Sequence, residues 1–256
     1  MRDKKIGIIG GVGPYAGVDL VKKIMDNTIA VTDYDHIPVF LLSDPLLVPD
    51  RTNFLTGVSQ INPAYGIIEG FSKLKELGAE VVAIACNAAH SPRIMGEVEK
   101  WNHSEGSLQI VNIVRETIQA LTDEKNKIRN VATLSVAGTY HSRVFENALS
   151  DAGYHVVELG DQMKKEIHET IWSPDFGIKA FSNPVKEEAI QRLKNIIRNL
   201  SEKRADTVIL ACTEIPLAIQ EKKIHGCNIV DPTTILARAL IRESNSEKLS
   251  KQFTVC

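Results

Sequence analysis

A match between two distant parts of the chain constrains the fold most. Residues 78–86 and 204–212 align without a gap at an offset of 126. Each is a short apolar run rich in β-branched residues that ends in a cysteine, Cys86 in the first and Cys212 in the second. Such runs are typical of strands covered on both faces, as in a parallel sheet. The carboxyl ends of these strands are where ligands bind, so we expect both cysteines at a sheet edge that binds a ligand.

The repeat extends beyond the cysteines. Residues 5–14 and 130–139 both predict a strand followed by a glycine loop, and Ile6 pairs with Val131 and Gly13 with Gly138 at an offset of 125. Strands and helices alternate along the chain, which favours an α/β protein. We therefore predict two pseudo-symmetric three-layer αβα domains with parallel sheets and an active-site cleft between them. The first comprises residues 1–114 and 220–256 and the second residues 115–219, and the charged segment 123–130 is the best candidate for a boundary on this side.

The finer pattern predicts where individual elements lie. Helices are expected at 15–27, 62–77, 90–101, 114–121, 141–152, 161–171, 185–203 and 233–243, and further strands at 38–42, 108–113, 154–159 and 228–232. Residues 43–53 and 172–184 read as loops, and the tail 244–256 is polar and expected to fray at its end.

Composition excludes several classes of function. The 256 residues carry a net charge of −2, with no long basic run for nucleic acid. Aromatic residues make up 5% of the chain, too few for a stacking platform. No apolar stretch reaches membrane length, and residues 6–12 are too short for a signal peptide, so we expect a cytoplasmic protein without membrane partners. The four cysteines form no CxxC pair and are expected to be thiols. Cys227 and Cys256 have no repeat partner, so we expect no function for them.

Two facing cysteines favour acid–base chemistry at carbon. Residues after Cys86 and Cys212 resemble helix starts, and a helix N-terminus lowers the pKa of a nearby thiol. The same backbone N–H groups bind a carboxylate. A small amino acid held there has one sulfur on each face of its Cα, so one thiolate removes the α-proton and the opposite thiol returns one. This predicts a two-base racemisation.

Six segments in chain order resemble the aspartate/glutamate racemase family, nearest its aspartate branch. They are Gly10–Pro14, Val48–Thr52, Cys86–His90, Gly177–Lys179, Cys212–Glu214 and Asp231–Pro232. The resemblance implies two α/β domains, a buried cleft, no cofactor and a homodimer. It also implies a small acidic amino acid, most of all aspartate, as the substrate.

The resemblance also assigns residues to roles. It implies that Cys86 and Cys212 are the catalytic pair and that Arg51 binds the side-chain carboxylate. Asn87 and Thr213 match residues that contact the α-amino and α-carboxylate groups, and Lys179 matches a lysine that reaches into the site. The predicted substrate-binding set is Gly11, Arg51, Asn87, Ala88, Thr139, Lys179, Thr213 and Glu214, with no metal ligand. Glu214 has the alternative role of a helix cap.

Two positions depart from the family pattern and bear on the substrate. Ala88 stands where the family has a threonine, which removes a hydroxyl donor, and Tyr15 follows Pro14 where the family has Ala-Thr. The glutamate branch carries Asp-Ser in its first loop and a histidine after the second cysteine. This chain has Gly10-Gly11 and Thr213-Glu214-Ile215 there, so the glutamate branch fits less well.

Four alternatives stay open beside aspartate racemisation. A racemase of broader specificity, a decarboxylase or isomerase of dicarboxylic acids, and an inactive dicarboxylate-binding relative all fit the same cleft. The glycines at 11, 13 and 17 also approach a dinucleotide fingerprint. That interpretation leaves the repeat and both cysteines unexplained.

Overall fold

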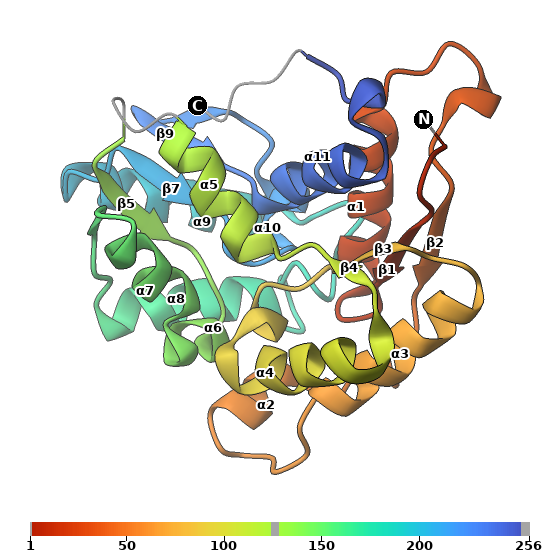
Figure 1. Cartoon of the computed structure of the whole chain (residues 1–256). Helices are drawn as coiled ribbons and strands as arrows, with labels where there is room; N and C mark the ends of the chain where they lie inside the picture. The colour runs from red at the N-terminus through yellow and green to blue at the C-terminus, as the bar shows by residue number, and fades with distance from the viewer. Residues whose placement is uncertain (1, 124–127, 252–256) are drawn as a thin grey trace.

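The computed structural model describes residues 2–123 and 128–251 and contains two sheets (Figure 1). The first has the order β2-β1-β3-β4 and the second the order β6-β5-β7-β9-β8. The first is built from β1 (Ile6–Ile9), β2 (Val39–Leu42), β3 (Val81–Ile84) and β4 (Gln109–Ile110). The second is built from β5 (Asn130–Thr133), β6 (His155–Val156), β7 (Thr207–Ile209), β8 (Lys223–Ile224) and β9 (Cys227–Val230). Neighbouring strands run parallel, apart from β8 against β9.

The two copies of the sequence repeat form pairs of strands that have the same register in their two sheets. Ile6 of β1 lies opposite Val81 of β3, and their counterparts Val131 and Thr207 lie opposite each other in the second sheet. Each cysteine strand therefore occupies the same place beside the strand of its glycine loop. The predicted α/β fold with parallel-dominated sheets is confirmed.

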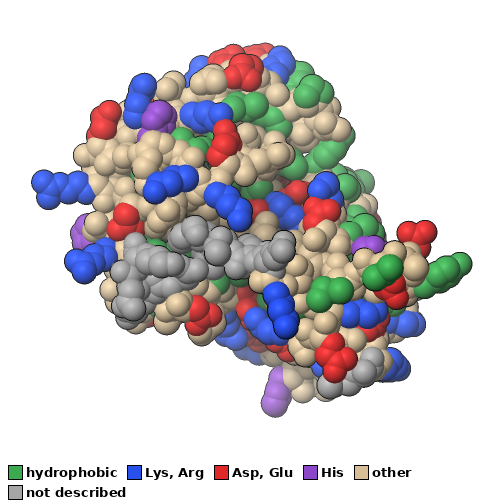
Figure 2. Space-filling model, turned by 90° about the horizontal axis from the view of Figure 1, so that it is seen from above, with side chains coloured by type: hydrophobic (Ala, Val, Ile, Leu, Met, Phe, Trp, Pro, Cys, Tyr) green, Lys and Arg blue, Asp and Glu red, His purple; other side chains and the backbone are tan. Residues whose placement is uncertain are grey.

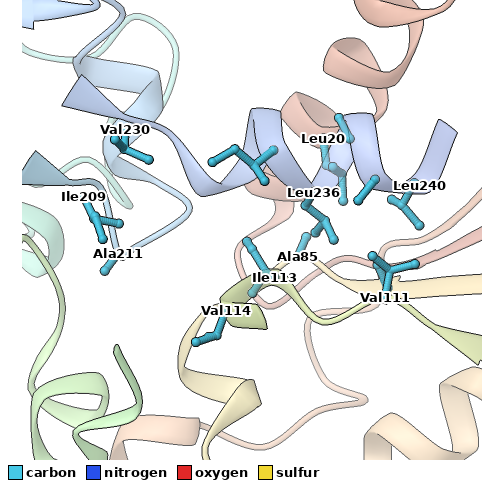
Figure 3. Close-up of a cluster of buried hydrophobic side chains, with 14 of the residues drawn as sticks. Leu20, Ala85, Val111, Ile113, Val114, Ile209, Ala211, Val230, Leu236 and Leu240 are labelled. Carbon is cyan, nitrogen blue, oxygen red and sulfur yellow. The ribbon is translucent and has the colours of Figure 1, made fainter. Parts of the chain in front are cut away.

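Helices cover both faces of each sheet and form three apolar cores. On the outer side of the first sheet are α3 (Ala64–Glu76) and α4 (Pro92–Trp101), and on that of the second are α8 (Asp161–Trp172) and α9 (Glu187–Glu202). The third core is shared by residues of both sheets, with Ala85 and Val111 from the first and Ile209 and Val230 from the second (Figure 3). Its helices are α1 (Pro14–Asn27), α5 (Ile113–Asp123), α7 (Val144–Asp151) and α11 (Pro232–Asn245).

The two halves exchange their last helices. Helix α5 follows β4 of the first sheet but packs against α11 and against α7, the latter beside the second sheet. Helix α11 follows β9 of the second sheet but packs on α1 beside the first. Within the segment 220–256, α11 packs on α1 beside the first sheet, whereas β8 and β9 pair within the second sheet. The boundary candidate 123–130 falls largely outside the described residues.

Local differences from the expected elements have local causes. The helix expected at 141–152 is two helices, α6 (Ala137–Ser142) and α7, because Arg143 adopts a left-handed φ of 51° between them. The loop expected at 43–53 contains the start of α2 (Arg51–Leu55), where Asp50 accepts the Asn53 N–H at 2.6 Å and caps the helix. The remaining short elements are α10 (Ile215–Ala218), a π-helical turn at Asn102–Gly106, and 3₁₀ turns at Asp33–Asp35, Ala88–His90 and Ser246–Lys248.

Candidate active site

The two repeat cysteines lie at the carboxyl ends of equivalent strands. Cys86 follows β3 and Cys212 follows β7, and their exposed fractions are 7% and 6%. Both line a single pocket of about 340 Å³ of empty space. The repeat therefore brings two buried thiols from different sheets to one small cavity.

Most residues predicted for the site line this same pocket. Besides the two cysteines, these are Arg51, Asn87, Ala88, Thr139, Lys179, Thr213 and Glu214. Gly11 lies instead in an adjoining outer chamber that shares several walls with the pocket. The structure thus gathers the predicted side chains in one place, while their individual roles remain predictions.

The paired glycines allow each half to approach the site loop of the other. A Cβ on Gly13 would lie 2.0 Å from Glu214 Oε1, and a Cβ on Gly138 would lie 2.8 Å from the Thr52 Cα. Neither contact could exist with a larger residue, because real Cβ atoms do not approach other atoms so closely. Both glycines of the repeat therefore serve the close packing of the two halves around the pocket.

On one side of the pocket, Cys86 lies beside a buried guanidinium. The first helical residue of α2 is Arg51, whose Nη atoms donate to the carbonyls of Val12 (2.6 Å), Val48 (3.3 Å) and Pro49 (3.2 Å). Burial opposes the charge of Arg51, but its hydrogen bond with Cys86 and the charge there raise the Arg51 pKa above its usual value. A thiolate on Cys86 therefore has a cationic partner.

On the other side, Cys212 faces a carboxylate. Its Sγ donates to Glu214 Oε2 at 3.0 Å, and Lys179 Nζ donates to Glu214 Oε1 at 2.5 Å. Burial raises the pKa of the Cys212 thiol well above its usual value, and the Glu214 charge raises it further. The expected lowering by a helix N-terminus is therefore wrong for Cys212. The following helix, α10, has four residues, and its effect is outweighed by burial and a neighbouring anion.

Lys179 and Glu214 form a nearly buried ion pair. Burial lowers the pKa of Lys179, but the charge of Glu214, the charge at Cys212 and the hydrogen bond to Glu214 together outweigh burial, so the net effect raises the pKa. The ammonium also lies 4.8 Å from the centroid of the Trp172 ring. Both partners line the pocket, so its wall carries Arg51 and Lys179 as cations and Asp50 and Glu214 as anions.

Several buried polar atoms in the pocket have no partner within the described residues. They are Arg51 Nε, the Nδ2 and Oδ1 atoms of Asn87, and the hydroxyl of Thr139. Buried polar groups are nearly always hydrogen-bonded, so these atoms are suited to a bound polar ligand. The Thr213 hydroxyl differs, because it donates to the Ala85 carbonyl at 3.1 Å and so joins the two cysteine loops.

The structure adds wall residues that the sequence did not single out. These are Val12, Asp50, Thr52, Val136, Trp172 and Ala211. Trp172 ends α8 and was expected to begin a loop. The sequence did contain a signal for Trp172, because it lies seven residues before Lys179. A large aromatic side chain at the end of a helix is stabilised by contact with another group, which here is the wall of the pocket.

Other site chemistries find little support in the described residues. Among residues 2–123 and 128–251, no cluster of three or more His, Cys, Asp or Glu could hold a metal ion. Three of the predicted thiols, Cys86, Cys212 and Cys227, are free, and Cys256 lies outside the described residues. Within the same part of the chain, no helix is long and apolar enough to cross a membrane.

Comparison with known proteins identifies the family. The profile of the Asp/Glu/hydantoin racemase family matches residues 9–240, which is most of the chain. This chain therefore belongs to that family, and it is an amino-acid racemase, an isomerase.

Three relatives illustrate the range of the family. The broad-specificity amino-acid racemase RacX of Bacillus subtilis is 23% identical over 92% of this chain and 96% of its own. The aspartate racemase of Picrophilus torridus superposes with a TM-score of 0.77 at 28% identity, over 94% of both chains. A Francisella tularensis glutamate racemase solved with D-glutamate has a TM-score of 0.65 at 14% identity, over 99% of this chain and 86% of its own. This last likeness shows the fold alone.

Proposed function

We propose that this racemase interconverts the enantiomers of a small acidic amino acid, with aspartate as the first substrate, by a two-base mechanism without a cofactor. One observation carries the proposal. Cys86 and Cys212 come from equivalent strands of two different sheets and line one buried pocket. An acid and a base on opposite faces of one carbon are what an inversion at Cα needs.

The charges of the pocket wall suit an amino dicarboxylate. The wall carries two cations, Arg51 and Lys179, and two anions, Asp50 and Glu214, so both signs of charge are present for aspartate, which has two carboxylates and one ammonium group. We assign the side-chain carboxylate to Arg51, because a guanidinium matches a carboxylate in shape. The unpartnered atoms of Asn87 and Thr139 would then bond the α-amino and α-carboxylate groups.

The two cysteine sulfurs exchange the roles of acid and base in each turnover. One cysteine, as thiolate, takes the α-proton, and the electron pair of the C–H bond moves toward the α-carboxylate. The opposite thiol gives its proton to the other face of Cα and becomes the thiolate. When Cys212 acts as the base, Cys86 is the thiol that supplies the proton to the other face, and Glu214 Oε2 accepts the Cys212 proton beforehand, because the Cys212 thiol already donates to that oxygen.

The test is α-proton exchange in heavy water. Each enantiomer of aspartate should lose its α-proton with the purified protein and appear as the other enantiomer. Cys86→Ala and Cys212→Ala should each abolish racemisation, while the remaining sulfur still exchanges the α-proton of the one enantiomer that faces it. Cys227→Ala, which changes a buried thiol outside the pocket, is the matched control and should keep its activity. Near-normal turnover in both single variants would refute the two-base assignment.

Two other functions remain to be separated by the same assay. The RacX relative favours a racemase of broader specificity, which a panel of amino acids would reveal. Aspartate binding by calorimetry without exchange would instead support an inactive dicarboxylate-binding protein. Release of carbon dioxide from malonates, or isomerisation of maleate, would support a related decarboxylase or isomerase.

A homodimer in the cytoplasm is part of the same proposal. Figure 2 shows apolar side chains exposed along the right-hand side of the molecule, where α1 and β2 lie in Figure 1. Val31 and Tyr34 are almost fully exposed, and within the described residues β2 pairs on one side, with β1. A second copy would cover such a surface. Light scattering of the purified protein and cell fractionation test the two statements.

A further inference from the structure

The cysteine pocket adjoins a larger outer chamber. The chamber has about 1080 Å³ of empty space, against about 340 Å³ for the pocket. The two share Val12, Asp50, Arg51, Trp172, Lys179 and Glu214 as walls. A substrate held between the sulfurs by its α-groups can therefore extend its side chain past Arg51 into the chamber.

Apolar side chains line much of the outer chamber. Tyr15, Leu46 and Trp172 have exposed fractions of 46%, 94% and 40%, and prolines at 14, 45 and 49 complete the wall. A group of large exposed apolar side chains around a concave surface marks a binding site more often than chance exposure. The continuity of this surface with the cysteine pocket selects the substrate as its occupant.

Arg51 does not require an acidic substrate side chain. Its guanidinium already donates to three backbone carbonyls, those of Val12, Val48 and Pro49, and it lies beside Cys86. Lys179 is likewise neutralised by Glu214 at 2.5 Å. The Nη atoms of Arg51 and the ammonium of Lys179 therefore have partners when no carboxylate is bound, and Arg51 Nε is the one of these donor groups that lacks one among the described residues, so an uncharged side chain leaves most of this charge hydrogen-bonded.

From these contacts we infer that the outer chamber is a side-chain subsite, and that the enzyme also racemises amino acids with long apolar or aromatic side chains. The inference rests on the proposed racemisation between Cys86 and Cys212 and extends it to a second class of substrate. Tyr15 and Leu46 are specificity-determining residues in this view, because they contact the outer part of the side chain and not the reacting carbon.

The experiment compares substrates in one exchange assay. The wild-type protein is incubated in heavy water with phenylalanine, leucine, alanine and aspartate, and kcat/KM is measured for each. Phenylalanine and leucine should exchange within about tenfold of aspartate. The double variant Tyr15→Ser/Leu46→Ser should lower the ratio of kcat/KM for phenylalanine to that for alanine about tenfold, the usual effect of losing a few apolar contacts. Val58→Ser, a similarly exposed valine away from both cavities, should leave the ratio unchanged.

Each outcome decides the inference. Exchange of aspartate without exchange of phenylalanine or leucine overturns the subsite and leaves the proposed function standing. An unchanged ratio in the double variant also overturns it. If the double variant is a monomer where the wild type is a dimer, and the ratio of kcat/KM for phenylalanine to that for alanine is unchanged, then a second copy of the chain covers the chamber wall and the subsite is overturned. Exchange with none of the amino acids refutes the proposed function and the subsite together.

Discussion

Replacing Glu214 with glutamine tests the asymmetry between the two thiols. Glu214 is 3% exposed, and its two oxygens accept from Cys212 Sγ at 3.0 Å and from Lys179 Nζ at 2.5 Å. Glutamine keeps the shape but loses the charge and the ability to take a proton. The Glu214 charge is, after burial, the largest cause that raises the pKa of Cys212. Glu214→Gln should therefore lower that pKa.

The same change should slow racemisation about 100-fold. A positioned general base contributes roughly 10² to 10⁴ in rate, and glutamine cannot accept the Cys212 proton. A thiolate of lower pKa is also a weaker base toward the α-proton. Lys179 loses its ion pair, which costs about 1–3 kcal/mol of stability, below the range for fully buried pairs because the Lys179 side chain is 20% exposed. Enantiomers have equal free energies in water, so kcat/KM must fall equally in both directions.

Two measurements check this reasoning. Alkylation of Cys212 by iodoacetamide, followed by peptide mass spectrometry, should rise at lower pH in the variant than in the wild type, while kcat/KM falls. Glu221→Gln is the matched control, because Glu221 pairs with Lys194 at 2.6 Å and does not line the cysteine pocket. A variant that keeps kcat/KM within threefold of the wild type, or in which Cys212 needs higher pH to react, would refute the argument.

Two further predictions concern packing and pH. Gly13→Ala should lower kcat/KM at least tenfold, because the new Cβ would displace the Glu214 carboxylate, whereas Gly160→Ala, whose Cβ would meet nothing within 4 Å, should have wild-type kinetics. Buried His90 donates through Nδ1 to the Cys86 carbonyl at 2.8 Å, and burial lowers its pKa from 6.5 to about 4. The folded state thus keeps the His90 ring neutral, whereas the unfolded chain takes up a proton there below pH 6.5. The free energy of unfolding should therefore fall as the pH falls from 6.5 toward 4, by about 3 kcal/mol at 1.36 kcal/mol per pKa unit. Urea unfolding at several pH values should show this loss in the wild type and a smaller one in His90→Gln, and equal pH dependence of the two proteins would contradict it.

Much of the fold could be predicted because the apolar pattern decides strands and helices locally. The buried runs ending at Cys86 and Cys212 became β3 and β7, and the expected helices at 161–171 and 185–203 became α8 and α9. The predicted bounds gave residues 115–219 to the second half and residues 220–256 to the first, but the apolar pattern of α5 and α11 does not decide their placement by itself. An amphipathic helix after a strand has an apolar face, but its sequence does not say which half that face will cover.

The sequence predicted which residues lie near the pocket, but it did not predict their charge interactions or pKa shifts. The resemblance placed Arg51, Lys179 and Glu214 near the substrate, and all three line the pocket. The Lys179–Glu214 pair joins positions 35 residues apart, and no periodicity in the sequence indicates it. The pKa of Cys212 depends on burial and on this pair, so its direction could only follow from the folded arrangement.

The repeat makes the two thiols equivalent in backbone position, but their neighbours make them different acids. Cys86 lies beside the guanidinium of Arg51, whereas Cys212 donates to Glu214 and has a raised pKa, which favours its thiol form. Because its raised pKa keeps Cys212 protonated, the free protein should offer Cys212 as the acid and accept first the enantiomer whose α-proton points away from Cys212. Since kcat/KM is equal for both enantiomers, this preference must show in kcat and KM separately. The enantiomer that meets the resting protonation state should have the lower KM, and Glu214→Gln should reduce the difference.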